Sequence, residues 1–357
     1  MRLSKFSYSI KSKFDIWTIN HIELGETNLI VGRNATGKSK FLTEIDALAD
    51  YLSNNEVLPN VEYGESEFIW EVEFIDEKQN LINYKIRIGE FDNGKRYQDE
   101  KLVVNNLIVA ERNQSYAKIY SSLSNSYINI NPPDDILIIN SRRDKDEFPF
   151  FEKIIKWAKG FKLVRFSQQE NLKFYDLDTA EEIVRLDKKA LKSVISNINA
   201  LGYEIDDITV DKTTKFNHVF IKEKNLYNLL GPHEISTGMY RTLGLLAYIE
   251  FNLAKDYVST IAIDDLSEGL DYERATKLGK LLVKKLENSN IQFIATSNDS
   301  FLMDVIPIKY WNILRRDGNT VSSFNYQNSK ERFDKFLMTG LSNFDLFSSN
   351  YLMRPQP

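Results

Sequence analysis

Apolar residues recur with the period of a helix in some parts of the chain and with the period of a strand in others. Residues 28–31 predict a short buried strand, and the sequence SKFLTEIDALADYL that soon follows predicts an amphipathic helix. A long apolar helix is expected from residue 239 to about 253, and buried strands are expected at 259–263 and 291–296. Strands and helices therefore alternate in the N-terminal segment and again after about residue 230.

The middle of the chain has a different pattern. Apolar and polar residues alternate between residues 65 and 104, around an Asp-Asn-Gly turn, so antiparallel strands are expected there. No apolar heptad is sustained over three or four repeats, which favours a compact insert over a long coiled coil. After residue 314 we expect a hairpin around Asp317 and Gly318, then a short helix and an aromatic-rich tail.

Composition narrows the class of protein. The 357 residues, 42% of them hydrophobic, can bury one large core or two modest ones. The chain has no cysteine, which excludes disulfides, thiolate metal sites and cysteine nucleophiles and suits a reducing cytosol. The formal net charge of -5 gives no global attraction to nucleic acid or acidic membranes. Without a membrane-spanning apolar run or a signal peptide, a soluble, cytoplasmic protein is expected.

The segment GRNATGKS, between the strand at 28–31 and its helix, matches the phosphate-binding pattern G-x-x-x-x-G-K-[ST]. Its glycines permit the torsions that gather backbone N–H groups at a helix N-terminus, where phosphate oxygens bind. Lys38 is expected to reach the β- and γ-phosphates, and the Ser39 hydroxyl to bind Mg²⁺. The alternative is a chance match in an ordinary strand-to-helix turn. The expected nucleotide-binding residues are Gly32, Asn34, Ala35, Thr36, Gly37, Lys38, Ser39 and Lys40.

A later strand carries the acids that such a site needs. Residues 259–263 end in Asp264 and Asp265, and a turn and a Lys-rich amphipathic helix follow. Acids at the carboxyl end of a parallel strand lie where open α/β sheets bind ligands. Asp264 is expected to hold Mg²⁺ directly or through water, and Asp265 to polarise the attacking water, with Glu268 as the second candidate for that role. Alternatively, the two aspartates only cap the following helix.

Two more polar segments border apolar elements. Ser236, Thr237 and Gly238 open the long apolar helix, an arrangement that either binds phosphate or serves as a plain helix cap. Asn298 follows the strand at 291–296, and its amide either closes a surface turn or hydrogen-bonds a phosphate.

In this order, the P-loop, the Ser-Thr-Gly helix, the Asp-Asp strand, the SEGLD turn and FIATSND resemble the ABC-type ATPases. Within them, the likeness is to the RecF, OLD and SMC-like group of small bacterial AAA-type ATPases. It covers residues 1–50 and 230–314 and implies an α/β P-loop NTPase head. That head has a mostly parallel core sheet, an antiparallel β subdomain and a helical insert. The resemblance implies one domain over residues 1–357, with lobes at 1–50, 51–229, 230–314 and 315–357.

In that family two heads bind two ATP molecules between them, each held by one subunit's P-loop and the other's signature helix. The resemblance assigns Ser236 and Gly238 to the signature, Leu270 and Asp271 to the dimer seam, and Asn298 to the γ-phosphate sensor. Arg241, three residues past Gly238, either contacts phosphate or the partner, or is a solvated residue on the helix.

The chain departs from the family pattern at several positions. The signature reads STGMYR instead of the LSGGQ of transporters, Asp265 stands where most relatives have glutamate, and Asn298 where they have histidine. Aspartate is shorter by one methylene, and an amide cannot carry the proton or the charge of histidine. Slow ATP hydrolysis is therefore expected, which suits a switch better than a pump.

The remaining charged and aromatic clusters leave two interpretations open. Arg142 and Arg143 lie among acids, and the lysines at 187–192 and 283–286 suit solvated helix faces, although contact with DNA is the alternative. The aromatic residues of the C-terminal tail are expected to pack onto the protein's own core or to dock a partner.

Together these features predict an Mg-ATP-binding, slowly hydrolysing ATPase that forms a head-to-tail dimer with itself. We expect it to control a partner effector, such as a nuclease or toxin, in bacterial anti-phage defence or DNA maintenance, without contacting a membrane. The acidic cluster of a Toprim nuclease is not visible in the sequence. The alternatives are a DNA-repair ATPase that clamps DNA directly and a scaffold that binds ATP without hydrolysing it.

Overall fold

The structure is a computed structural model, and it describes residues 1–13, 16–54, 66–90, 96–113, 116–133, 136–165, 178–212, 217–256 and 259–353. The chain divides into two units: unit 1 comprises Met1–Lys162 and Lys309–Arg332, and unit 2 comprises Leu163–Ile308 and Phe333–Pro357. The P-loop belongs to unit 1, whereas the Asp-Asp strand, the signature helix and Asn298 belong to unit 2.

Unit 1 is rich in strands and unit 2 in helices. The strands of unit 1 are β1 (Arg2–Ser12), β2 (Ile16–Glu23), β3 (Thr27–Val31), β4 (Ser66–Ile75), β5 (Leu81–Glu90), β6 (Arg96–Val104), β7 (Leu107–Asn113), β8 (Tyr116–Ser121), β9 (Ser126–Ile130), β15 (Trp311–Asp317) and β16 (Thr320–Asn325). Its helices are α1 (Lys38–Asn54), α2 (Ile138–Ser141) and α3 (Pro149–Lys159). Unit 2 contains α4 (Thr179–Val184), α5 (Lys188–Ala200), β11 (Ile205–Asp211), β12 (His218–Glu223), α6 (Thr237–Ala254), β13 (Ser259–Asp264), α7 (Tyr272–Leu286), β14 (Ile291–Ser297), α8 (Ser300–Val305), α10 (Asn343–Ser348) and the 3-10 helix η2 (Tyr351–Met353). The elements at the boundaries between units are β10 (Phe161–Arg165), η1 (Ile308–Tyr310) and α9 (Lys330–Leu337).

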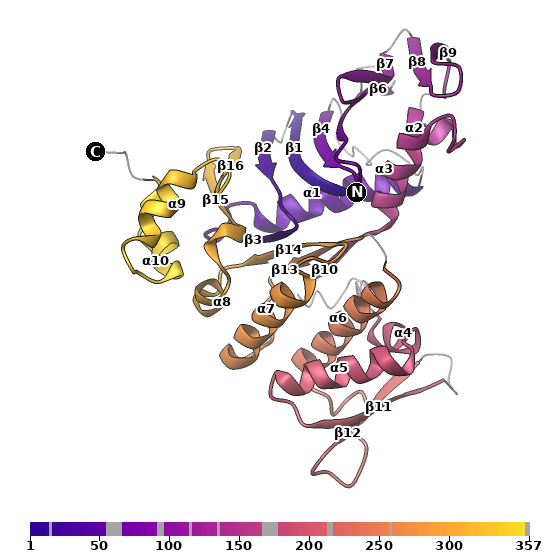
Figure 1. The fold of residues 1–357 in the computed structure, drawn as a ribbon. Coiled ribbons are helices and arrows are strands. Elements are labelled where there is room, and N and C mark those ends of the chain that lie inside the picture. The colour runs from indigo at the N-terminus through magenta and orange to yellow at the C-terminus, as the bar shows by residue number, and fades with distance from the viewer. Residues whose placement is uncertain are drawn as a thin grey trace. The chain divides into compact units, whose positions relative to one another are not determined.

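The sheet of unit 1 joins its strands in the order β3-β15-β16-β2-β1-β4-β5-β6-β7-β8-β9. The pairs β3·β15 and β2·β16 are parallel, and the other pairs described in this unit are antiparallel. Helix α1 packs against this sheet, where Phe41 meets Phe6 of β1 with ring centroids 5.6 Å apart and Tyr51 meets Trp70 of β4 at 6.3 Å (Figure 1).

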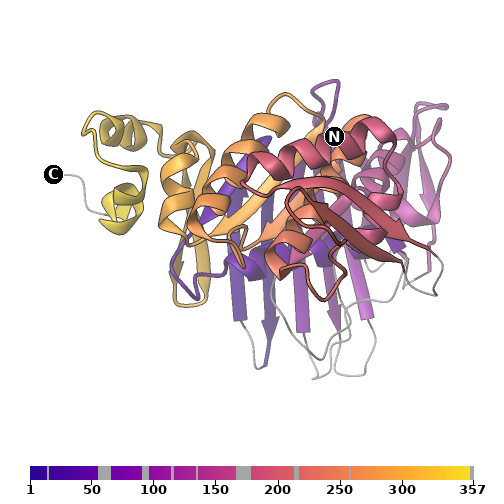
Figure 2. The ribbon, with the colours of Figure 1, turned by 90° about the horizontal axis from the view of Figure 1, so that it is seen from below.

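Unit 2 is built around the parallel pair β13·β14, which aligns Ser259 with Ile291 and Ile263 with Ala295. The strands are buried almost throughout, as expected for parallel strands covered on both faces. Helices α6 and α5 lie side by side, and the antiparallel β11–β12 hairpin lies on the other side of α5 (Figures 1 and 2).

The α/β class is confirmed, and the predicted elements at the P-loop, the signature, the acid-bearing strand and residues 291–296 correspond to β3, α1, α6, β13 and β14. The balance of strand directions differs from the expected mostly parallel core. The sheet of unit 1 is mostly antiparallel with two parallel pairs, and in unit 2 the pair β13·β14 is parallel. Short connections join β4 to β9 in succession, and short connections impose antiparallel pairing. The predicted single domain and its lobe boundaries stay predictions.

The C-terminal hairpin is confirmed, since Asp317 pairs with Thr320 and Gly318 has a φ angle of 56°. In the aromatic tail, Phe333 and Phe336 are 0% and 1% exposed, so these two rings pack into the protein interior. The predicted Asp-Asn-Gly turn at residues 92–94 lies outside the described residues. Of the helices that the structure describes, none combines the length and apolar character needed to cross a membrane.

Candidate functional site

The P-loop connects β3 to α1 in a tight, glycine-dependent turn. Ala35 and Gly37 have φ angles of 62° and 98°, in the region that favours glycine. A Cβ atom on Gly32 would lie 2.5 Å from Thr36 Oγ1, and one on Gly37 would lie 3.0 Å from the ring of Trp17. Both glycines are therefore needed for the loop to close this tightly in front of the helix.

The side chain of Lys38 lies across the loop. Its Nζ donates to the carbonyl of Gly32 at 2.7 Å and to that of Arg33 at 3.3 Å, and Thr36 Oγ1 also donates to the Arg33 carbonyl at 2.8 Å. The ammonium is thus held at the N-terminus of α1. Phosphate oxygens are stronger hydrogen-bond acceptors than carbonyls and can replace them as its partners. The exposed residues of this segment are Arg33, Asn34, Ala35 and Ser39.

Residues distant in sequence support the P-loop. Arg316 of β15 donates from Nη1 to the carbonyl of Ala35 at 3.2 Å, and its guanidinium lies 4.4 Å from the centroid of the Trp17 ring. Lys40 Nζ lies 5.5 Å from a Trp17 ring centroid and 3.8 Å from the Glu44 carboxylate. Sequence analysis missed Trp17 and Arg316, because no spacing pattern connects β2 and β15 to the loop.

The acid turn, residues 264–271, follows β13 and is anchored by a threonine on β14. Thr296 Oγ1 donates to Asp264 Oδ1 at 2.7 Å and accepts the backbone N–H of Asp265 at 2.8 Å. Thr296 is 1% exposed, and its carbonyl accepts the N–H of Leu266 at 3.0 Å. The buried Thr296 hydroxyl therefore orients the Asp264 carboxylate and fixes the backbone of Asp265, which has a φ angle of 55°.

Asp265 and Glu268 are connected by hydrogen bonds within the acid turn. The N–H of Glu268 donates to the Asp265 carbonyl at 3.0 Å, and Ser267 Oγ donates to Asp265 Oδ1 at 3.4 Å. Burial and repulsion from the Asp265 carboxylate raise the pKa of Glu268, against the opposing effect of Arg241. A raised pKa makes a carboxylate a better proton acceptor, so Glu268 stays a second candidate base beside Asp265.

The helix after the acid turn is capped by another aspartate. Asp271 is the N-cap of α7, and its side chain accepts the N–H of Arg274 at 3.0 Å. The alternative in which Asp264 and Asp265 serve only as the helix cap is therefore wrong.

The signature helix α6 begins against the acid turn. Ser236 is its N-cap, accepting the N–H of Met239 at 3.3 Å. A Cβ on Gly238 would lie 2.3 Å from the carbonyl oxygen of Gly269, so only glycine fits there. A Cβ atom added to Gly269 would lie 3.5 Å from Nη1 of Arg241, so this guanidinium lies beside the acid turn of its own unit.

Asn298 is exposed immediately after β14. The hydrogen bonds that close this turn come from its neighbours: Asp299 Oδ1 accepts the N–H groups of Phe301 and Leu302 at 2.8 and 3.0 Å, and the Asp299 N–H donates to Ser297 Oγ at 3.0 Å. The N-cap of α8 is therefore Asp299 and not Asn298, and both roles considered for Asn298 stay predictions.

The oxygen donors available fit Mg²⁺ at a phosphate site. Among the described residues, no group of three or more His, Asp or Glu side chains is arranged as a protein-only metal site. Mg²⁺ beside phosphates uses one or two carboxylates together with phosphate oxygens and water. Each unit carries an oxygen donor of that kind: the exposed Ser39 at the start of α1 in unit 1, and Asp264, oriented by Thr296, in unit 2.

The sequence matches the model of the AAA_21 family, described as "AAA domain, putative AbiEii toxin, Type IV TA system", over residues 27–304. The match starts at β3 and ends within α8, so it includes the P-loop, the signature helix, the acid turn and Asn298. The chain belongs to this family. A search of curated proteins found no matching relative.

Three SMC heads are among the solved structures with a similar fold. The Smc head bound to the C-winged helix domain of ScpA matches with a TM-score of 0.56 and 12% identity, over 93% of this chain and 100% of that one. The Pyrococcus furiosus Smc head with an extended coiled coil, bound to the C-terminal domain of ScpA, gives 0.50 and 11%, over 94% and 99%. The Thermotoga maritima SMC head domain gives 0.48 and 15%, over 91% and 99%. The AAA_21 family indicates a nucleotide-binding P-loop ATPase, and the chain shares the fold of SMC heads.

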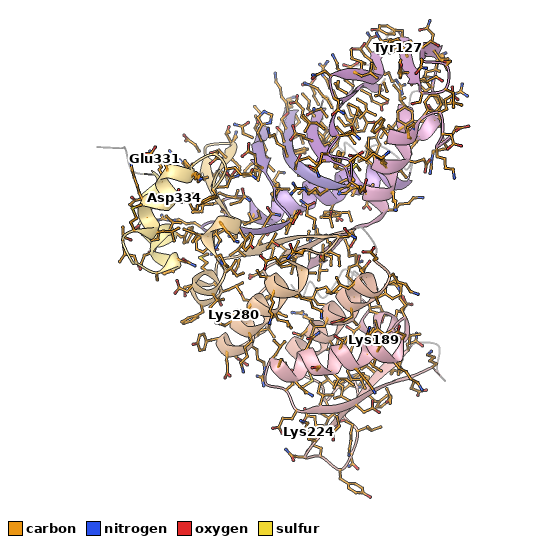
Figure 3. The ribbon with its side chains drawn as sticks, in the orientation of Figure 1. Tyr127, Lys189, Lys224, Lys280, Glu331 and Asp334 are labelled. Carbon is orange, nitrogen blue, oxygen red and sulfur yellow. The ribbon has the colours of Figure 1, made fainter. Side chains whose placement is uncertain are left out.

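The basic clusters of this AAA_21 protein are partly engaged internally. Arg143 pairs with both carboxylate oxygens of Glu152, and Lys285 Nζ lies 2.5 Å from Glu250. By contrast, Lys189 on α5 and Lys280 on α7 are exposed, and their side chains extend from the surface of unit 2 (Figure 3). In the two clusters singled out by the sequence, Lys188, Lys189, Lys192 and Lys284 are exposed, as expected for solvated helix faces, and Lys285 is the exception.

Proposed function

We propose that this chain binds Mg-ATP, hydrolyses it slowly, and pairs head to tail with a second copy around the nucleotide. The observation that carries the proposal is the P-loop geometry, in which the Lys38 ammonium bridges the carbonyls of Gly32 and Arg33 at the start of α1. A flexed glycine loop, a helix N-terminus and a positioned ammonium together bind phosphate groups.

Each acid and amide has a proposed role in hydrolysis. Lys38 contacts the β- and γ-phosphates, Ser39 and Asp264 are the Mg²⁺ ligands, and Mg²⁺ when bound would neutralise phosphate charge. Asp265 polarises the attacking water, and Asn298 donates a hydrogen bond to the γ-phosphate or to that water. Because aspartate reaches less far than glutamate and an amide carries no charge, turnover is slow.

The signature residues are proposed to serve the nucleotide bound by the partner copy. Ser236 and Gly238 form the N-terminus of α6, an arrangement suited to a γ-phosphate. Arg241 lies one turn further along, beside the acid turn, where it would connect the partner's phosphate to the proposed base.

The conformational cycle is proposed to control a partner effector, such as a nuclease or toxin in bacterial defence or DNA maintenance. The family description names a toxin of a type IV toxin–antitoxin system, which supports a role beside a second component. Two similar Smc heads were solved bound to domains of ScpA, which supports docking of a protein partner by a head of this fold.

The deciding experiment compares wild-type protein with Asp265→Asn. The amide still hydrogen-bonds water but cannot accept its proton, so the variant should retain ATP and accumulate as a dimer. Sedimentation velocity with and without ATP and Mg²⁺ measures the dimer fraction, and phosphate release measures turnover.

Three results separate the rival functions. A variant that stays monomeric with ATP and Mg²⁺ contradicts the ATP-bound dimer. If the wild-type protein releases no phosphate, and its dimer fraction equals that of Asp265→Asn, the protein is a non-hydrolysing scaffold. Hydrolysis stimulated by DNA and lost in Arg142→Glu would indicate a DNA clamp, although the pairing of Arg143 with Glu152 argues against that surface.

A further inference from the structure

Tyr272 and Phe301 form an exposed aromatic pair in unit 2. Their ring centroids are 4.5 Å apart with an interplanar angle of 62°, and the two residues are 60% and 52% exposed. An isolated exposed aromatic residue is ordinary, but two rings in contact form a small apolar surface of the kind that anchors protein interfaces.

The pair borders the proposed ATPase residues. Tyr272 is the first residue of α7 and directly follows Asp271, the N-cap that ends the acid turn. Phe301 is the second residue of α8, three residues after Asn298. The edge-to-face contact therefore joins the segment carrying the acids to the segment carrying the proposed phosphate contact.

Acids outnumber cations on either side of the pair. Residues 264–277 contain five acids and two basic residues, Arg274 and Lys277, which form ion pairs with Asp271 and Glu273. Residues 297–306, around Phe301, contain two acids and no basic residue. The P-loop segment has the opposite character: residues 33–40 contain three basic residues and no acid, and Arg316 adds a fourth cation against Trp17. An acidic surface with exposed rings is complementary to a surface of lysine and arginine, through Coulomb attraction and cation–π contacts.

We propose that the Tyr272–Phe301 pair is an anchor for a second copy of this chain, contacting the basic P-loop rim of that copy when ATP is bound. This inference rests on the proposed head-to-tail dimer, in which the signature and acid turn of one copy face the P-loop of the other. A two-fold symmetric dimer contains the contact twice, so one substitution removes two anchors.

The experiment uses the full chain carrying Asp265→Asn as the parent and adds Tyr272→Ala with Phe301→Ala. With ATP and Mg²⁺, the double substitution should raise the dimer dissociation constant by at least roughly 30-fold, the size typical of an interface hot spot. The affinity of the monomer for a fluorescent ATP analogue should stay unchanged. Tyr227→Ala is the matched control, because Tyr227 is an aromatic residue of the same unit that is 97% exposed and distant in sequence from the acid turn.

Conservative and opposing variants guard against an effect on folding. Tyr272→Phe keeps the ring and should keep the dimer, whereas Tyr272→Arg places a cation against a basic surface and should weaken it. A double alanine variant that dimerises like its parent overturns the inference while leaving the proposed ATPase intact. A parent that stays monomeric with ATP overturns the dimer and, with it, this contact.

Discussion

The P-loop of unit 1 and the acid turn of unit 2 hold their functional groups in different ways. In the P-loop, backbone groups of one short segment do the positioning: Lys38 rests on the carbonyl of Gly32 at 2.7 Å, and the N–H of Phe41 donates to Gly37 at 2.8 Å. In the acid turn, Asp264 is oriented by the hydroxyl of Thr296, which lies 32 residues further along the chain.

The P-loop is positioned by consecutive residues, whereas the acid turn depends on a neighbouring strand. A loop that positions its own groups fixes residue types at a definite spacing, and that spacing is readable as a motif. A carboxylate oriented by a neighbouring strand depends on the register of β13 against β14. Substitutions in the P-loop should therefore remove binding, whereas substitutions around the acid turn should mainly disturb orientation and turnover.

The largest effect is expected from Lys38→Ala. Loss of a charged hydrogen bond to phosphate costs about 3 kcal/mol, or about 100-fold in the dissociation constant for ATP. Isothermal titration with a non-hydrolysable ATP analogue measures it. Lys5→Ala is the control, since Lys5 forms only a 3.9 Å ion pair with Glu23 on the sheet of the same unit. Retained affinity in Lys38→Ala would rule out the P-loop as the nucleotide site.

Gly238→Ala should have the next largest effect. The added methyl group would meet the Gly269 carbonyl at 2.3 Å, so α6 and the acid turn must move apart. Overpacking of this kind costs about 2 kcal/mol and should lower the melting temperature of the protein by roughly 5 °C. Gly231→Ala is the control, because its new Cβ would have no neighbour closer than 3.6 Å. Equal melting temperatures for the two variants would show that the signature helix does not rest on the acid turn.

Thr296→Val tests the side-chain anchor that distinguishes the acid turn. Valine keeps the shape but leaves the Asp265 N–H and the Asp264 carboxylate without the hydroxyl, at a cost of about 1–2 kcal/mol. We expect the Mg²⁺ concentration for half-maximal ATPase activity to rise about tenfold. Thr296→Ser retains the hydroxyl and should behave like wild type. Should both variants show the wild-type Mg²⁺ dependence, Asp264 is not a Mg²⁺ ligand positioned by Thr296.

Asn298→Ala should reduce turnover more than ATP binding. Loss of one neutral hydrogen bond in the transition state is worth about 1 kcal/mol, which corresponds to about fivefold in rate. Asn290→Ala is the control, since Asn290 precedes the same strand at its opposite end and pairs with Asp256 at 2.6 Å. If turnover and binding are both unchanged in Asn298→Ala, the residue only completes a loop.

The smallest expected change concerns pH. Burial raises the pKa of Glu268, so its carboxylate takes up a proton at a higher pH than an ordinary glutamate does. If Glu268 assists Asp265 as a base, the ATPase rate falls as pH drops through that raised pKa. Glu268→Gln then removes this fall from the low-pH side of the pH–rate profile. Identical pH profiles for wild type and Glu268→Gln would leave Asp265 as the only candidate base of the two.

Much of the fold and of the site follows from the sequence where the governing interactions are local. Strand β3, helix α1, the P-loop glycines and the acids after β13 were all predicted, because apolar period and residue spacing encode them directly. The strand directions of the large sheet were not, since the pattern of one strand does not reveal its neighbours. The roles of Trp17 and Arg316 were also missed, since each contacts the P-loop from another strand.

By itself, the sequence determined a glycine-rich loop with the phosphate-binding pattern, the order of signature, acids and amide after it, and the absence of cysteine. Only the tertiary structure decided that Thr296 holds Asp264, that Gly238 lies against Gly269, and that the rings of α7 and α8 meet at an exposed point. The physical reason is distance along the chain. Backbone torsions and helix N-termini are properties of a few consecutive residues, whereas these contacts depend on how strands align and helices pack.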